Sequence, residues 1–121
     1  MNILLIDNDK YTTEVVRQIL SADYEIDIYN SSTKAFLHYS ENPTNFGIVF
    51  TDFLMDKMNG DELIEEMLKI NSNQSFIIST NTMNKKLIDL SKIHPDKIYL
   101  FDKPYDLKML KVLCDSIIRA L

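Results

Sequence analysis

The sequence predicts an α/β fold in which helices cover both faces of an open, five-stranded parallel sheet. Five short apolar runs alternate with five segments of helical periodicity along the 121 residues. This strict alternation is typical of βαβ units with right-handed crossovers, which place their strands parallel in one sheet. A chain of this length with 45% apolar residues can bury one sizeable core. We therefore expect a single domain over residues 1–121.

The apolar runs give the expected strands, at residues 2–6, 24–29, 46–51, 75–80 and 97–102. The first, third and fourth runs are nearly continuous in Ile, Leu, Val and Phe, as expected of central strands buried on both faces. The second run alternates polar and apolar residues, which indicates a half-exposed edge strand.

Each apolar run is followed by a stripe of apolar residues at helical spacing. The stripes lie within residues 15–20, 35–39, 63–68, 83–93 and 107–121. Asp9 is the expected amino-terminal cap of the first helix, and Asn59 with Glu62 forms the expected capping box of the third. The second helix must end before Pro43 and the fourth before Pro95, because the residue before proline disfavours helical backbone.

Composition excludes several classes of protein. The net charge of −5 argues against direct nucleic-acid binding, which needs a basic surface. With Cys114 as the only cysteine, no disulfide can form within the chain, which favours a reducing, cytoplasmic setting. No apolar stretch approaches the roughly 18 residues of a membrane span. The chain has two glycines, too few for a glycine-rich dinucleotide or nucleoside-phosphate loop.

Four polar residues fall at or just beyond the ends of predicted strands: Asp7, Asp52, Thr80 and Lys103. In open parallel sheets, ligands bind at the carboxyl edge of the strands. Clustered carboxylates repel one another unless a cation neutralises them, and a hard dication such as Mg²⁺ suits oxygen ligands. Asp52 could then attack a phosphorus atom to form an acyl phosphate. Lys103 and the Thr80 hydroxyl would stabilise the other phosphoryl oxygens.

These residues, with Asp7-Asn8 and Lys103-Pro104-Tyr105, resemble the receiver domain of two-component response regulators, in particular its single-domain chemotaxis-regulator type. The resemblance spans essentially the whole chain, and residues 51–60 are similar to the family's loop after the phosphoacceptor. It implies a flavodoxin-like, doubly wound sheet with strand order 2-1-3-4-5 and five helices.

The resemblance further implies that Asp52 accepts a phosphoryl group from a sensor histidine kinase or a histidine phosphotransfer protein. Thr80 and Lys103 would contact that group. The implied ligands of Mg²⁺ are Asp7, Asn8, Asp52 and the Leu54 carbonyl. Such a protein is not an enzyme for another substrate, because it catalyses only its own phosphorylation and a slow self-dephosphorylation.

The resemblance also implies an output surface, formed by the fourth helix, the fifth strand and the fifth helix. Here that surface is basic, which favours an acidic downstream protein or an output domain outside this sequence. Its lysines include Lys85, Lys86, Lys97 and Lys108. We expect neither membrane binding nor direct nucleic-acid binding by this domain.

Four positions depart from the family pattern, among them Asp56, which occupies a common proline position. Asn8 stands where a second acid is usual, so we expect weaker Mg²⁺ binding. Asn81 replaces a small residue beside Thr80 and would narrow access to Asp52. Leu100 occupies the usual position of an aromatic residue, and strand alternation should point Tyr99 to the opposite face. The sequence leaves open whether Asn8, Asn81 and Leu100 abolish phosphorylation and switching or only tune them.

Two alternative functions remain at the level of the sequence. The first is a phosphorylation-independent pseudo-receiver that acts as a protein-interaction module. The second is a haloacid-dehalogenase-type phosphatase, since Asp7-Asn8-Asp9 has the DxD pattern that opens that family, with Asp7 as nucleophile. Mapping the phosphorylated residue distinguishes the phosphatase from the receiver, because the two predict Asp7 and Asp52 respectively.

Overall fold

The computed structural model describes residues 2–81, 84–103 and 105–121 of the chain. Strands and helices alternate in it as the sequence predicts, and the predicted strand ends are correct to within one residue. The elements are β1 (Asn2–Ile6), α1 (Lys10–Leu20), β2 (Glu25–Tyr29), α2 (Ser32–Glu41), β3 (Phe46–Asp52), α3 (Gly60–Ile70), β4 (Ser75–Thr80), α4 (Lys85–Ile93), β5 (Ile98–Asp102) and α5 (Leu107–Arg119).

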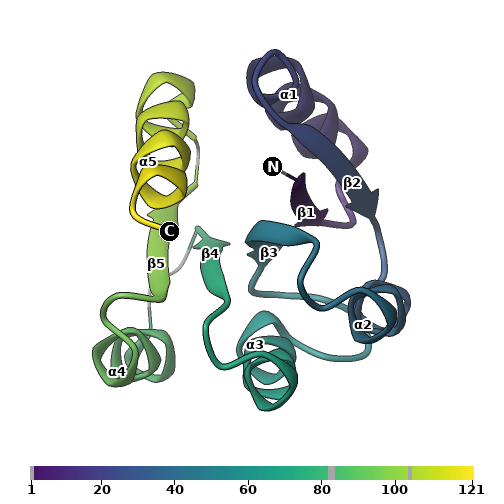
Figure 1. Cartoon of the computed structure of the whole chain (residues 1–121), viewed down its shortest axis with the longest axis vertical. Helices are drawn as coiled ribbons and strands as arrows, with labels where there is room; N and C mark the ends of the chain where they lie inside the picture. The colour runs from purple at the N-terminus through teal and green to yellow at the C-terminus, as the bar shows by residue number, and fades with distance from the viewer. Residues whose placement is uncertain (1, 82–83, 104) are drawn as a thin grey trace.

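The strands form one parallel sheet in the order β2-β1-β3-β4-β5, which confirms the flavodoxin-like prediction. Helices α1 and α5 lie on one face of this sheet, and α2, α3 and α4 lie on the other (Figure 1). β2 is an edge strand, as predicted, and its Ile28 is 37% exposed. None of the described helices is long and apolar enough to cross a membrane.

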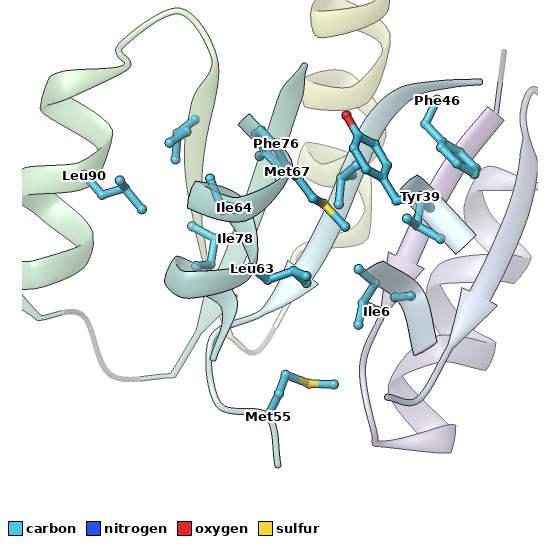
Figure 2. Close-up of a cluster of buried hydrophobic side chains, with 14 of the residues drawn as sticks. Ile6, Tyr39, Phe46, Met55, Leu63, Ile64, Met67, Phe76, Ile78 and Leu90 are labelled. Carbon is cyan, nitrogen blue, oxygen red and sulfur yellow. The ribbon is translucent and has the colours of Figure 1, made fainter. Parts of the chain in front are cut away.

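Alternating strand residues supply two separate apolar clusters, because successive side chains point to opposite faces of a sheet. In β1, Ile3 and Leu5 pack toward α1 and α5, whereas Leu4 and Ile6 pack toward the other helices. Figure 2 shows the cluster on the α2–α4 side, where side chains from α3 meet those of the central strands. These central strands are buried on both faces, so the positions of their carboxyl ends are rigidly determined.

The helix ends agree with the sequence predictions in part. The Asp9 side chain caps α1 by accepting a hydrogen bond from the Tyr11 amide at 3.0 Å. Asn59 is the cap residue of α3, but the predicted capping box is wrong, because its side chain makes no capping hydrogen bond. It instead accepts one from the Met55 amide at 3.2 Å, closing the loop after β3. Leu121 lies beyond the end of α5 and is 59% exposed.

The predicted fourth stripe begins at Met83, which lies outside the described residues. Within them, Asn84 caps α4 by accepting a hydrogen bond from the Leu87 amide at 3.0 Å. Leu87 and Leu90 are buried on the sheet side of this helix, as the spacing predicts.

A buried carboxylate of α3 forms an ion pair with a lysine of α4. The Asp61 side chain, in the first turn of α3, is 2% exposed, and its Oδ2 lies 2.7 Å from Lys86 Nζ. The Asp61 oxygens have no other partner among the described residues. Contact with this carboxylate raises the pKa of Lys86. Lys86 therefore compensates a charge inside the fold, although the sequence places it on the presumed output surface.

Replacing Lys86 with Met should lower stability far more than replacing Lys85 with Met. Loss of Lys86 leaves the Asp61 carboxylate buried without its counter-charge, which is strongly destabilising. Lys85 pairs with Asp89 at 3.0 Å on the exposed side of α4, and such surface pairs contribute about 0.5 kcal/mol or less. Urea unfolding followed by circular dichroism would compare the two variants. Equal losses would contradict this account of Asp61.

Candidate functional site

The carboxyl ends of four strands converge at one edge of the sheet. Asp7 follows β1, Asp52 ends β3, Thr80 ends β4 and Lys103 follows β5. The backbone itself joins the last two, because the Lys103 amide donates to the Thr80 carbonyl at 3.0 Å. The structure thus brings all four sequence-predicted residues to the same edge.

Lys103 bridges the two carboxylates. Its Nζ lies 3.3 Å from Asp7 Oδ2 and 3.4 Å from Asp52 Oδ2. The Asp7 side chain is only 2% exposed, whereas that of Asp52 is 14% exposed. Asp7 is therefore enclosed beneath the site, and Asp52 is the carboxylate that an incoming group can reach.

One ammonium does not fully compensate two carboxylates in a partly buried site. Burial raises the pKa of Asp52 above its ordinary value, the charge of Asp7 raises it further, and Lys103 only partly offsets both effects. Because a nearby cation stabilises the charged form of a carboxylate, such a site favours the binding of a further cation.

The two acids of the turn after β1, Asp7 and Asp9, have different roles. Asp7 Oδ1 accepts a hydrogen bond from the Asp9 amide at 2.9 Å, which fixes the orientation of its carboxylate. The Asp9 side chain accepts from the Thr12 hydroxyl at 2.8 Å, and this bond above all lowers the pKa of Asp9. Asp9 therefore serves the start of α1, as the sequence predicts, and the exposed Asn8 is left beside the site.

The donor set at this edge fits a magnesium ion. Asp7 and Asp52 supply carboxylate oxygens, and the predicted Asn8 amide and Leu54 carbonyl would add neutral oxygens. Among the described residues, no group of three or more His, Cys, Asp and Glu side chains is arranged to hold a metal. Mg²⁺ suits such a sparse set, because it usually keeps several waters and binds through one or two carboxylates.

Gly60 has a positioning role that the sequence analysis does not assign. The first residue of α3, it donates its amide to the Phe53 carbonyl at 2.7 Å. A Cβ here would lie 2.6 Å from the Asp52 carbonyl oxygen and 2.9 Å from Ile78 Cδ1. Only glycine lets α3 begin this close to the end of β3. The sequence does contain a signal for this role, because Gly60, one of the two glycines in the chain, follows the loop after Asp52.

A pocket of about 520 Å³ opens beside Lys103, between the start of α1 and the start of α5. Asn81 is exposed and contributes to its wall, and the effect of Asn81 on access to Asp52 stays a prediction. The lining residues are Tyr11, Thr12, Val15, Asn81, Lys103, Tyr105 and Leu107.

The prediction for the two faces of β5 is confirmed. Tyr99 packs with the cluster beneath α1 and α5, whereas Leu100 packs with the cluster on the α2–α4 side. The side of β5 that faces α4 therefore presents Leu100, without an aromatic ring at that position.

Replacing Asp52 with Asn should stabilise the protein near pH 7. The pKa of Asp52 is raised in the folded state, so folding disfavours its charged form. This cost grows as the pH rises from the ordinary carboxyl pKa of about 4 through the raised value, and it vanishes below both. In Mg²⁺-free buffer we expect a higher Tm for the variant near pH 7 and little difference near pH 3. A variant less stable than the wild type near pH 7 would contradict this sign.

Comparison with known proteins gives a family match and close structural neighbours. A family model described as response regulator receiver domain matches residues 3–113. A response regulator receiver domain protein from Clostridium thermocellum has TM-score 0.83 and 24% identity, over 98% of this chain and 94% of that one. A CheY-like receiver domain protein from Methanospirillum hungatei JF-1 has TM-score 0.86 and 23% identity, over 98% and 94%.

A third neighbour is the CheX–CheY–BeF₃–Mg²⁺ complex from Borrelia burgdorferi, with TM-score 0.86 and 22% identity over 97% of this chain and 88% of that one. At these identities the solved structures show a shared fold. A comparison with curated protein sequences finds no significant match.

Proposed function

This chain belongs to the response regulator receiver domain family of two-component signalling, and we propose that it accepts a phosphoryl group on Asp52. The observation that carries the proposal is the Lys103 ammonium, held 3.3 Å from Asp7 and 3.4 Å from Asp52 at the carboxyl edge of the sheet. The donor would be the phosphohistidine of a sensor kinase or a phosphotransfer protein. We take residues 1–121 as one receiver domain.

In the proposed reaction a carboxylate oxygen of Asp52 forms a bond to phosphorus while the bond from phosphorus to the histidine nitrogen breaks. The electron pair of the broken bond remains on the imidazole. Lys103 would turn from the Asp52 carboxylate to a phosphoryl oxygen, and the Thr80 hydroxyl would donate to another. Asp7, Asn8, Asp52 and the Leu54 carbonyl would hold Mg²⁺, which would supply positive charge against the phosphoryl oxygens.

The exposure of the two aspartates favours Asp52 over Asp7 as the phosphorylated residue. Asp7 is 2% exposed, and its two carboxylate oxygens accept bonds from the Asp9 amide and from Lys103. A nucleophile must reach the phosphorus atom, and this enclosed carboxylate is poorly placed to do so. Asp7 fits the role of metal ligand, which argues against the phosphatase alternative.

We propose that phosphorylation biases a two-state surface formed by α4, β5 and α5. Lys85 and Lys86 already pair with Asp89 and Asp61, so Lys97 and Lys108 are the better candidates for contacts with an acidic partner. Apolar side chains lie exposed on the same elements, namely Ile93 at 69%, Met109 at 54% and Val112 at 55%. The partner would be a downstream protein or an output domain outside this sequence.

Two further expectations belong to this proposal. The protein would work in the cytoplasm, where histidine kinases present their phosphohistidine. It would not act as an enzyme on another substrate, since the acyl phosphate forms and hydrolyses on its own Asp52.

Beryllofluoride, which mimics a phosphoryl group on a carboxylate, tests the proposal directly. With Mg²⁺ present, adding beryllofluoride should shift the ¹⁵N–¹H resonances of residues around Asp52, Thr80 and Lys103. The Asp52→Asn variant, which keeps the shape of the side chain, should show no such shifts. Shifts that extend to α4, β5 and α5 would locate the output surface. An unchanged wild-type spectrum at high Mg²⁺ would contradict the proposal and favour the pseudo-receiver.

Replacing Asn8 with Asp should tighten Mg²⁺ binding. The substitution adds a negatively charged oxygen ligand beside Asp7, and affinity for hard dications rises with ligand charge. We expect roughly a tenfold decrease in Kd, on the scale by which neighbouring groups tune metal sites. NMR titration with MgCl₂ would measure it, with Asn45→Asp as the control for added charge away from the site. Equal affinity of Asn8→Asp and wild type would show that residue 8 does not reach the metal.

A further inference from the structure

The Tyr105 hydroxyl forms a hydrogen bond across the site, to a strand distant in sequence. Tyr105 follows β5 in the connection to α5, and its Oη donates to Ser79 Oγ in β4 at 2.8 Å. Burial raises the pKa of Tyr105 above its ordinary value, so the phenol keeps its proton at neutral pH and acts as a donor. Neither residue is among those that the receiver pattern assigns to the reaction.

Ser79 is the strand residue beside the candidate phosphoacceptor. In the parallel register of β3 and β4 it pairs with Asp52, and its carbonyl accepts a hydrogen bond from the Phe53 amide at 2.9 Å. Ser79 is fully buried. A hydrogen bond to its side chain therefore ties Tyr105 to a fully buried strand residue next to Asp52.

The ring of Tyr105 is held on more than one side. It meets Phe50 edge-on, with ring centroids 5.8 Å apart and planes at 60°, and it lies 5.8 Å from the ring of Phe101. These contacts fix the ring, and the bond to Ser79 fixes its rotation and depth.

Lys103 Nζ lies 5.9 Å from the centroid of that fixed ring. A lysine side chain has four rotatable carbon segments, so its ammonium needs support to remain at one point. The attraction of an ammonium to an aromatic face is weak at this distance, but the ring also closes one side of the space open to Lys103. Within the described part of the chain, the ammonium also contacts the Asp7 and Asp52 carboxylates.

We propose that Tyr105, anchored by its hydrogen bond to Ser79, is a positioning residue that holds the Lys103 ammonium in reach of Asp52 during phosphoryl transfer. This inference rests on the proposed function. Tyr105 does not touch the reacting atoms and acts through Lys103. Its contribution is to keep the ammonium near the phosphoryl oxygens once Asp52 begins to bond to phosphorus, when Lys103 must leave its bridge between the carboxylates.

The key variant is Tyr105→Phe, which keeps the ring and removes only the hydroxyl. Phosphoramidate, a small donor with a phosphorus–nitrogen bond, would supply the phosphoryl group, and intact-protein mass spectrometry would follow labelling in the presence of Mg²⁺. We expect the labelling rate to fall by about three- to tenfold, which corresponds to the net contribution of one hydrogen bond. Lys103→Met should slow labelling more. Adding Tyr105→Phe to Lys103→Met should cause no further decrease, because the ammonium that Tyr105 positions is gone.

The double variant Ser79→Ala/Tyr105→Phe separates positioning from stability. Removing both partners leaves no buried hydroxyl unpaired, so urea unfolding should return close to the wild type, while the labelling rate should stay as low as in Tyr105→Phe. A rate that recovers together with stability would overturn the inference. An equal decrease from Tyr105→Phe with and without Lys103 would also overturn it.

The failure of the proposed function has a different signature. Labelling of Asp52→Asn at the wild-type rate would contradict phosphorylation on Asp52 itself. Wild-type labelling by Tyr105→Phe, with Asp52→Asn unlabelled, would contradict only the role of Tyr105.

Discussion

The ion pairs of Lys103 with Asp7 and Asp52 are the interaction on which the site depends. The two acids end or follow neighbouring strands, β1 and β3, and the ammonium comes from the residue after β5. Without a cation, two partly buried carboxylates at adjacent strand ends would repel each other and favour protonation. A lysine supplied by the far edge of the sheet places a positive charge between the two acids. Its ion pair with Asp7 also links the connection after β5 to the connection after β1.

The Lys103 ammonium compensates the charge of the two carboxylates at this edge only in part, and the proposed chemistry of the site depends on this. Asp52 keeps a raised pKa although Lys103 lies 3.4 Å away. This uncompensated negative charge is the physical basis of the proposed binding of a dication and, with it, of a phosphoryl group. Packing also helps to position the side chains of the site. Gly60 lets α3 approach the Asp52 carbonyl, and the Tyr105 ring lies on one side of the Lys103 ammonium. The functional side chains are thus held by neighbours that take no part in the reaction.

The sequence predicts the parts of this structure that follow from periodicity. Alternating strand and helix patterns locate the elements, and the resemblance adds the strand order and the residues that meet at the sheet edge. Long-range side-chain contacts leave no local pattern. The bond from Tyr105 to Ser79 and the pair of Lys86 with Asp61 join residues 26 and 25 positions apart in the numbering. The Asn59 side chain accepts a hydrogen bond from a loop amide instead of capping its own helix, and this likewise depends on how the loop folds.

Three acids and two lysines illustrate why surface charge cannot be assigned by composition alone. Lys103 compensates Asp7 and Asp52 at the carboxyl edge, and Lys86 compensates Asp61 between α3 and α4. The sequence analysis assigns Lys103 to the site but places Lys86 on the expected surface for partners. The Asp61 side chain is 2% exposed and that of Lys86 is 66% exposed, so a buried carboxylate is paired with a largely solvated ammonium. The pair links the first turn of α4 to the first turn of α3, the helix that begins beside Asp52. Of the lysines on the proposed output surface, Lys85 and Lys86 are thus already paired within the fold, which leaves Lys97 and Lys108 as the candidates for a partner.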